Sequence, residues 1–461
     1  MEKSIIIDEG ISYTRVALME DDRLVNIHLE NNYEEDIKGT IYQGMVSNLV
    51  KGMKAAFIDI GQPKKAFLHY KDVPEKLKGR LQNNQRIMVQ VVKEGVGSKG
   101  PKVSSYINIT GKYLILLPYE KTIGISRKIT NTDKREELKS IIKEHNPKEY
   151  GLIVRTGASK ATDREITQEL DQLTAKWEEI ETRAIGATGG TILYEEPSLT
   201  SKVIRGHVNH KIKEIVTNSN YQDDLLKDKV RLVDKTTNLY GAYGIDKEIQ
   251  KALSKRIWLK SGANIIIEKT EAMNVIDVNS AKLVNIKDKD KMALKANLEA
   301  ATESARQIRI RNLSGIIIID FIAMNKDSHK EAVVERLQAE LNKDRIKARV
   351  YPATDLGIVQ ITRKRTSLSL KEEIMQKCPS CNRADAYISY DYLLVDLEKD
   401  LREVARESIH KDVEIKAASS FIEHIKARED IISKIKEKYG INTRLTIDNK
   451  INKGKYEIHH I

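Results

Sequence analysis

Two aspartates, each inside an apolar run, are the residues of this chain whose types most directly suggest chemistry. Asp277 lies in Ala-Met-Asn-Val-Ile-Asp-Val-Asn-Ser (272–280), and Asp320 lies in Gly-Ile-Ile-Ile-Ile-Asp-Phe-Ile (315–322). Both runs are short and rich in β-branched residues, which predicts a buried strand around each carboxylate. A buried carboxylate is costly unless it is paired or binds a metal. A divalent cation facing a phosphate would explain both aspartates. Two unrelated acids, each held by a backbone amide or a lysine, would explain them about as well.

The segment between the two runs predicts a helix that would bring the aspartates together. Its apolar residues recur at helical spacing: Leu294, Leu298, Ala301, Ala305 and Ile308. A strand, a helix and a strand form a βαβ-like unit, which could place both aspartates at the same edge of one sheet. Mg²⁺ takes one or two protein carboxylates, waters and phosphate oxygens. Asp277, Asp320 and the nearby amide of Asn279 would supply such a site. Patterns for Ser, Cys or His nucleophiles are absent, which favours metal-assisted hydrolysis by water.

Composition and charge narrow the class of protein. The 461 residues include 79 Lys and Arg against 67 Asp and Glu, a net charge of +12. This excess favours a polyanionic partner, with nucleic acid ahead of an anionic membrane surface. The length predicts roughly two to four domains. No run approaches the ~18 apolar residues of a membrane span, and the N-terminus lacks the apolar core of a signal peptide. We therefore expect a cytoplasmic protein.

The only two cysteines lie close together in Cys378-Pro379-Ser380-Cys381. Their small number favours a reducing compartment. The pair is half of a Cys₄ zinc site, and the nearest histidine is His410. Four-coordinate zinc would therefore need two thiolates from each of two chains. A redox dithiol and two inert thiols in a turn remain alternatives.

Short strand-like segments between about 36 and 110 predict a small barrel. Phe57 and Phe67 lie on adjacent segments of it. Three lysines are near in the sequence: Lys64, Lys65 and Lys99. Aromatic faces beside basic residues suit single-stranded nucleic acid. The alternative is that both rings belong to the core, and stacking needs at least one of them exposed.

The next module, about 111–198, carries a different polar group. Arg155 and Thr156 end a strand in Val-Arg-Thr-Gly (154–157), a combination that can hold a terminal phosphate, although a polar turn is the simpler interpretation. Thr162 and Glu165 form a capping box that opens a helix. The apolar stripe of this helix is Ile166, Leu170, Leu173, Trp177 and Ile180.

Taken together and in this order, these motifs resemble the ribonuclease E/G family of bacterial endoribonucleases. The resemblance covers essentially the whole chain and lies in the catalytic half, not in the long scaffold tail of the E type. The segments that carry it are 275–280, 297–301, 315–322 and 378–381, with 55–61 and 151–156. From about 387 the similarity is slight, and the chain reaches Ile461 without a Pro-rich or Arg-rich scaffold. These departures favour a G-like enzyme.

The resemblance implies a role for each candidate residue. Asp277 and Asp320 would hold the catalytic Mg²⁺, with Asn279 orienting a carboxylate or the attacking water. The cysteines would form half of a zinc link between two chains of a homodimer, and whether dimers pair into tetramers is left open. The barrel residues that would contact RNA are Phe57, Phe67 and Lys99. The residues of a pocket that senses a 5′-monophosphate would be Gly111, Ile115, Arg155 and Thr156, with Lys347 beside it where the E type often has Arg.

The implied fold is multidomain, with α/β and α+β parts. It comprises a non-catalytic RNase H-like domain (1–34 and 199–254), an OB-type RNA-binding barrel (35–110), a 5′-phosphate sensor (111–198), a deoxyribonuclease I-like catalytic domain (255–373), a zinc linker (374–386) and a small C-terminal domain (387–461). The implied activity is Mg²⁺-dependent cleavage of single-stranded, A/U-rich RNA in rRNA maturation and mRNA decay. A non-catalytic RNA-binding protein of the same fold is the alternative, and the intact aspartate pair favours the enzyme.

Overall fold

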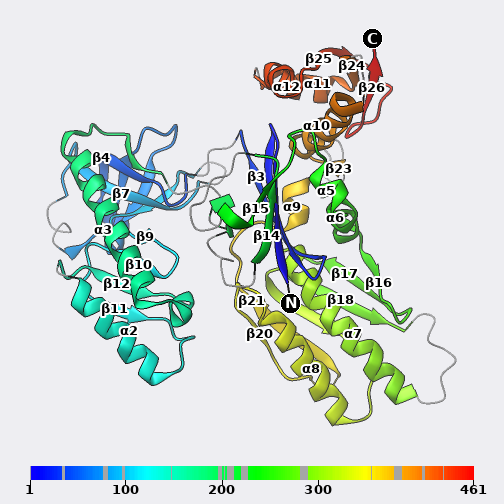
Figure 1. Cartoon of the computed structure of the whole chain (residues 1–461), viewed down its shortest axis with the longest axis horizontal. Helices are drawn as coiled ribbons and strands as arrows, with labels where there is room; N and C mark the ends of the chain where they lie inside the picture. The colour runs from blue at the N-terminus through cyan, green and yellow to red at the C-terminus, as the bar shows by residue number, and fades with distance from the viewer. Residues whose placement is uncertain are drawn as a thin grey trace. The chain divides into compact units, whose positions relative to one another are not determined.

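The computed structural model of the chain contains two compact units (Figure 1). The first unit combines Met1–Tyr33 with His210–Ile461, and the second is Glu34–Asn209. The residues described are 2–33, 37–75, 81–95, 99–146, 148–195, 200–201, 203–204, 212–219, 227–280, 289–354, 356–377, 387–407, 411–428 and 430–461. No helix in these segments has the length and apolar character that crossing a bilayer requires.

The first sheet of the first unit joins the N-terminus to residues that follow the second unit. Strands β1 (Lys3–Glu9), β2 (Tyr13–Glu20) and β3 (Arg23–Asn31) are antiparallel neighbours. Strands β14 (Ile212–Thr217) and β15 (Val230–Leu232) extend the sheet in parallel from β1. The strand order is β15-β14-β1-β2-β3. Helices α5 (Leu239–Ala242) and α6 (Ile245–Leu253) share a core with these strands. The three N-terminal strands therefore form one sheet with two strands that lie far later in the sequence.

The second sheet of this unit contains both aspartate strands. Its order is β16 (Arg256–Trp258), β17 (Asn264–Lys269), β18 (Met273–Asn279), β19 (Gly315–Asp320), β21 (Ile358–Arg363) and β20 (Ala348–Val350). Strands β18 and β19 are parallel and are joined by helix α7 (Lys289–Ile310), so the predicted βαβ unit is confirmed. Helix α8 (Asp327–Leu341) follows β19.

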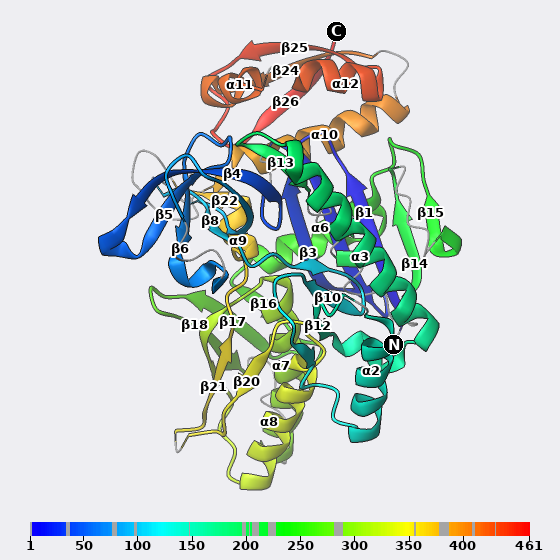
Figure 2. The same cartoon turned by 90° about the vertical axis from the view of Figure 1, so that its left-hand side faces the viewer.

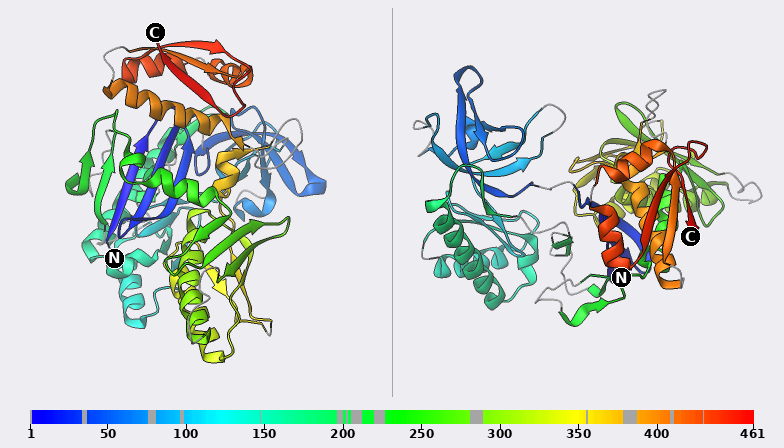
Figure 3. Two further views of the ribbon diagram at one scale, coloured as in Figure 1. Left: turned by 90° about the vertical axis from the view of Figure 1, so that its right-hand side faces the viewer. Right: turned by 90° about the horizontal axis from the view of Figure 1, so that it is seen from above.

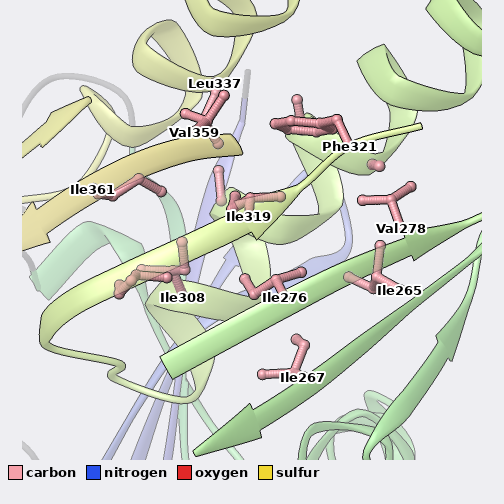
Figure 4. Close-up of a cluster of buried hydrophobic side chains, with 14 of the residues drawn as sticks. Ile265, Ile267, Ile276, Val278, Ile308, Ile319, Phe321, Leu337, Val359 and Ile361 are labelled. Carbon is pink, nitrogen blue, oxygen red and sulfur yellow. The ribbon is translucent and has the colours of Figure 1, made fainter. Parts of the chain in front are cut away.

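One face of this second sheet is covered by α7 and α8. Ile276, Ile319 and Ile361 point from the strands into a core with Ile308 of α7 and Leu337 of α8 (Figure 4). Because side chains alternate across a strand, residues at the intervening positions lie on the opposite face. That opposite face carries the aspartates.

The C-terminal part of the first unit is a small α+β layer. It comprises α9 (Leu370–Ile374), β22 (Met375–Gln376), β23 (Tyr387–Ile388), α10 (Tyr390–Glu407), β24 (Asp412–Ala417), α11 (Ser419–Lys426), α12 (Ile431–Tyr439), β25 (Asn442–Ile447) and β26 (Tyr456–His460). Helix α10 lies between the first sheet and the sheet β25-β24-β26 (Figure 3).

Residues 419–439 form two helices, α11 and α12, and not one continuous helix. Ile425 of α11 and Ile431 of α12 are both buried in one core. Six residues of continuous helix would turn Ile431 roughly 120° away from Ile425. The break between the helices therefore brings both side chains back to the same core.

The second unit begins with a closed barrel, as the sequence predicted (Figure 2). Its strands are β4 (Ile41–Val50), β5 (Ala55–Asp59), β6 (Ala66–His69), β8 (Lys102–Ser104) and β7 (Arg86–Lys93), and β7 pairs back onto β4. Strand β13 (Thr191–Tyr194) adds to the outside of β4.

Elsewhere in the second unit, a four-stranded sheet packs with two helices. The strands are β9 (Ile109–Thr110), β10 (Leu114–Leu117), β12 (Gly151–Val154) and β11 (Ile123–Ile125), and the helices are α2 (Thr132–His145) and α3 (Asp163–Gly186). Thr162 and Glu165 form the predicted capping box at the start of α3, and all five residues of its predicted apolar stripe are buried.

Candidate functional site

The two aspartates are direct neighbours on the sheet. Asp277 of β18 is the register partner of Asp320 of β19, and adjacent strands lie about 4.8 Å apart. Asp277 is half-buried and Asp320 is exposed. The expectation of two buried carboxylates is therefore wrong. Their neighbours Ile276 and Ile319 take the buried positions, and alternation places both carboxylates on the open face.

The surroundings of this pair fit a divalent cation with oxygen ligands. Asn279 Nδ2 donates to Asp277 Oδ2 at 2.6 Å, which orients that carboxylate. Within the described segments, no lysine or arginine forms an ion pair with either aspartate, and no group of three or more metal-ligating side chains occurs. Two carboxylates with room for water and phosphate oxygens match the usual protein contribution to a Mg²⁺ site.

Asn297 is a positioning residue that the chemical interpretation of the sequence missed. It is fully buried on α7. Its Oδ1 accepts from the Ile322 N–H at 3.0 Å, and its Nδ2 donates to the Ile322 carbonyl at 2.8 Å. Both bonds fix the main chain two residues after Asp320. The signal in the sequence is an amide in the predicted helix, directly beside the apolar position Leu298.

A second α7 side chain holds the turn between β16 and β17. The Glu299 carboxylate accepts from the backbone N–H groups of Lys260, at 2.6 Å, and Ser261, at 3.0 Å. Helix α7 thus fixes two loops of the sheet that carries the aspartates.

The two barrel phenylalanines form one aromatic pair. Phe57 of β5 and Phe67 of β6 are register partners, and their rings meet edge to face with centroids 6.0 Å apart. Both side chains are half-buried, so neither belongs wholly to the core. Lys65 Nζ donates to Ser47 Oγ at 2.8 Å, and Lys99 is exposed.

The four expected sensor residues of the second unit lie in the β9–β10 turn, on β10 and directly after β12. Arg155 Nη1 donates to the Gly111 carbonyl, and Ile115 pairs with Ile153 beside it on β12. The Thr156 hydroxyl lies 2.9 Å from Ser126 Oγ. Burial lowers the pKa of Arg155, but an arginine remains cationic at neutral pH.

Glu169 of α3 holds the turn on which this group depends. Its carboxylate accepts from the N–H groups of Tyr113, at 2.6 Å, and Leu114, at 3.0 Å, and also from that of Lys112. Burial raises the pKa of Glu169 despite these three donors. The turn next to Gly111 is therefore fixed by a carboxylate from the helix.

The remaining candidates lie elsewhere. Lys347 is exposed, directly before β20 in the first unit, so its place beside the sensor stays a prediction. Cys378 and Cys381 lie outside the described residues.

Sequence comparison identifies the family. The profile of the Ribonuclease E/G family matches residues 108–366, more than half of the chain. The chain belongs to the ribonuclease E/G family. The S1 RNA binding domain matches residues 35–104, which include the barrel strands β4 to β8.

Curated relatives extend the similarity beyond the range of the family profile. The chain is 34% identical to Ribonuclease G of Haemophilus influenzae, over 80% of this chain and 81% of that protein. It is 30% identical to Ribonuclease G of Escherichia coli strain K12, over 99% of each chain. It is 34% identical to Ribonuclease E of Synechocystis over 74% of this chain, but only 54% of that longer protein is covered.

Proposed function

We propose that this chain is a Mg²⁺-dependent endoribonuclease that cleaves single-stranded RNA. Its catalytic site contains Asp277 and Asp320. Membership of the ribonuclease E/G family makes the chain an endoribonuclease, and the S1 domain gives it an RNA-binding module. The observation that supports this site best is the register pairing of the two aspartates on the open face of the sheet.

Each residue of the site has a defined part in this proposal. When bound, Mg²⁺ would supply positive charge to the phosphate and acidify a water molecule. Asp277 and Asp320 would hold the cation, and the Asn279 amide fixes one oxygen of Asp277 by donating to it. Asn297 fixes the main chain after Asp320. In the hydrolysis, a bond forms between the water oxygen and phosphorus, and the bond from phosphorus to the 3′ oxygen breaks. The water loses one proton, and the 3′ oxygen takes up one proton. The products carry a 5′-phosphate and a 3′-hydroxyl.

Substrate selection is assigned to the second unit. Phe57, Phe67 and Lys99 of the barrel contact single-stranded, A/U-rich RNA, and the partial exposure of both rings supports stacking. The 5′-monophosphate pocket is formed by Gly111, Ile115, Arg155 and Thr156. We propose that the enzyme acts in rRNA maturation and mRNA decay.

The proposed architecture extends to domains and assembly. Three antiparallel strands followed by two parallel ones, in the order β3-β2-β1-β14-β15, support an RNase H-like domain made of 1–34 and 199–254. The mixed sheet with α7 and α8 supports a deoxyribonuclease I-like catalytic domain over 255–373. Cys378 and Cys381 contribute two thiolates to a zinc ion shared with a second chain, which gives a homodimer.

A cleavage assay with matched variants tests the catalytic site. A fluorescent single-stranded oligonucleotide is incubated with the protein in Mg²⁺ or in chelator. Asp277→Asn and Asp320→Asn should each abolish cleavage and retain RNA binding, since each loses a metal ligand and a negative charge near phosphate. Asp327→Asn is the control, because Asp327 is exposed on α8 and pairs only with Lys330 in the described contacts. Near wild-type cleavage by either site variant would reject the assignment. Binding without cleavage by the wild-type protein would favour the non-catalytic alternative.

A further inference from the structure

An exposed tryptophan lies on the same face of the sheet as the aspartate pair. The Trp258 side chain on β16 is 57% exposed, whereas Trp177, the other tryptophan of the chain, is 1% exposed. Tryptophan is highly buried on average in folded proteins. An indole this open therefore calls for an explanation other than the core.

The register of three strands places Trp258 and its neighbour Arg256 relative to the site. Arg256 is paired with Ile266 of β17, which is paired with Asp277. Directly paired residues project to the same face, so Arg256 stands in the same row as both aspartates. Two strand spacings separate Arg256 from Asp277, about 10 Å.

The pairing of Trp258 with its neighbours across the sheet places the indole on the same face as the aspartates. Trp258 is paired with Asn264, and Asn264 is paired with Asn279, the residue that orients Asp277. The indole therefore lies on the open face beside the row of the aspartates. It lies at the β16 edge of the sheet, within reach of a nucleotide close to a phosphate bound at the aspartates.

The two side chains have the chemistry that binds single-stranded RNA. The Arg256 guanidinium lies over the Trp258 ring, 5.9 Å from its centroid. In the described segments, the neighbouring Lys255 pairs with Glu268 at 2.7 Å, whereas no carboxylate pairs with Arg256. An aromatic face that stacks with any base, next to a cation free to meet phosphate, is the usual combination in single-strand binding sites.

We propose that Arg256 and Trp258 form an RNA subsite beside the catalytic aspartates, with the indole stacked on one base and the guanidinium bound to a phosphate. This inference rests on the proposed function, because it takes the scissile phosphate to lie at Asp277 and Asp320. The continuity of the sheet face between β16 and the aspartates, together with an arginine that no described carboxylate pairs with, favours RNA over an apolar protein partner. The subsite holds the nucleotide strand as it leaves the metal site toward the β16 edge.

Tryptophan fluorescence of the full chain tests whether RNA covers the indole. The buried Trp177 is an internal reference, so quenching by acrylamide reports mainly on Trp258. Because acrylamide is neutral, the positive charge of the protein surface does not change how easily it reaches the indole. In buffer without divalent cations, acrylamide should quench the free protein, and single-stranded RNA should protect it. Trp258→Phe should abolish both effects. An indole that acrylamide cannot reach in the free protein would mean that other protein covers it, and an accessible indole that RNA does not protect would equally overturn the proposal.

An abasic scan of the substrate identifies the base. Wild-type protein should lose affinity about 5- to 150-fold when the stacked base is removed, as expected for one base–aromatic contact. On intact RNA, the affinity of Trp258→Ala should be lower than that of the wild type by the same factor. Removing the stacked base from the RNA should not lower the affinity of this variant further. Trp258→Tyr should restore most of the affinity. Leu232→Ala is the control, since Leu232 is 58% exposed on the first sheet.

The outcome of the scan separates this proposal from the proposed function. A scan in which Trp258→Ala and wild type lose the same factor at every position would reject the subsite. Cleavage that still depends on Asp277 and Asp320 would leave the catalytic assignment standing in that case.

Discussion

The hydrogen bonds from Asn297 to the main chain of Ile322 offer a sharp test of how the metal site is held. Asn297 lies in the core beneath the sheet, and both of its polar atoms bind the backbone of Ile322. Asn297→Ala removes both partners and leaves the N–H and the carbonyl unpaired. The main chain that directly follows Asp320 is then no longer held in place by these bonds.

The expected magnitude follows from the two bonds. Each contributes about 0.5–1.5 kcal/mol net, so together they stabilise the fold by about 1–3 kcal/mol. The effect on the site should exceed the effect on stability. Removing a partner that orients a metal ligand typically lowers metal affinity or activity by about 10- to 100-fold. We expect the Mg²⁺ concentration at half-maximal cleavage to rise by about that factor in Asn297→Ala.

The assay combines Mg²⁺ titration of the cleavage rate with denaturant unfolding. Ser304→Ala is the matched control on the same helix, because Ser304 is fully buried and its Oγ has no hydrogen-bond partner in the described structure. This control should keep the wild-type Mg²⁺ dependence and lose little stability. If Asn297→Ala also kept that dependence, the inference that Asn297 positions Asp320 would fail, whatever the loss of stability.

Three further predictions concern other parts of the chain. Arg155→Ala should reduce the ratio of cleavage rates on 5′-monophosphorylated and 5′-hydroxyl RNA, and Arg164→Ala on α3 should not; a large wild-type ratio that survives in Arg155→Ala refutes the sensor. Elemental analysis should find about one zinc per two chains, and Cys378→Ser with Cys381→Ser should shift the mass from light scattering toward monomer; a zinc-free wild-type dimer contradicts this. Burial, and then the charge of a neighbouring carboxylate, raise the pKa of Glu373 from 4.5 to about 7. The contribution of Glu373 to the free energy of unfolding is therefore fully present below pH 4.5, where the side chain is protonated. It is lost as the pH rises through about 7. Glu373→Gln should narrow the Tm difference between pH 5 and pH 8.

Features that depend on residues close together in the sequence could be predicted from the sequence. The capping box at Thr162 and the buried stripe of α3 follow from three- and four-residue spacings, and the structure has both. The βαβ unit around Asp277 and Asp320 was also predictable, because its strands and its helix each carry a clear apolar period. In these cases, local pattern and final packing agree.

Features that depend on register could not be predicted in this way. The exposure of Trp258 follows from the antiparallel pairing of β16 with β17, which no local pattern specifies. The role of Asn297 follows from the approach of α7 to the chain after β19. The open position of the aspartates follows from which residues of each strand face the helices. A one-residue shift in register reverses that choice.

A repeated motif shows why the partners of an aspartate, and not its local sequence, decide what it can do. Three isoleucines precede Asp8 at the end of β1, just as isoleucines precede Asp320 at the end of β19. Asp8, however, is 1% exposed, and Arg402 Nη1 donates to its Oδ1 at 2.5 Å while Arg15 binds its Oδ2. Burial alone would raise the pKa of Asp8, but the two arginines outweigh it and hold the pKa below its usual range.

The consequence for chemistry is opposite at the two positions. Binding a cation at Asp8 would require breaking ion pairs inside the protein, and a buried charge left without its partner is strongly destabilising. Asp320 has no such partner among the described contacts and stands beside Asp277 on an open face. Arg402 lies 394 residues from Asp8 in the sequence. The difference between a structural carboxylate and a candidate metal ligand therefore arises from tertiary structure, through arginines that reach one isoleucine-flanked aspartate and not the other.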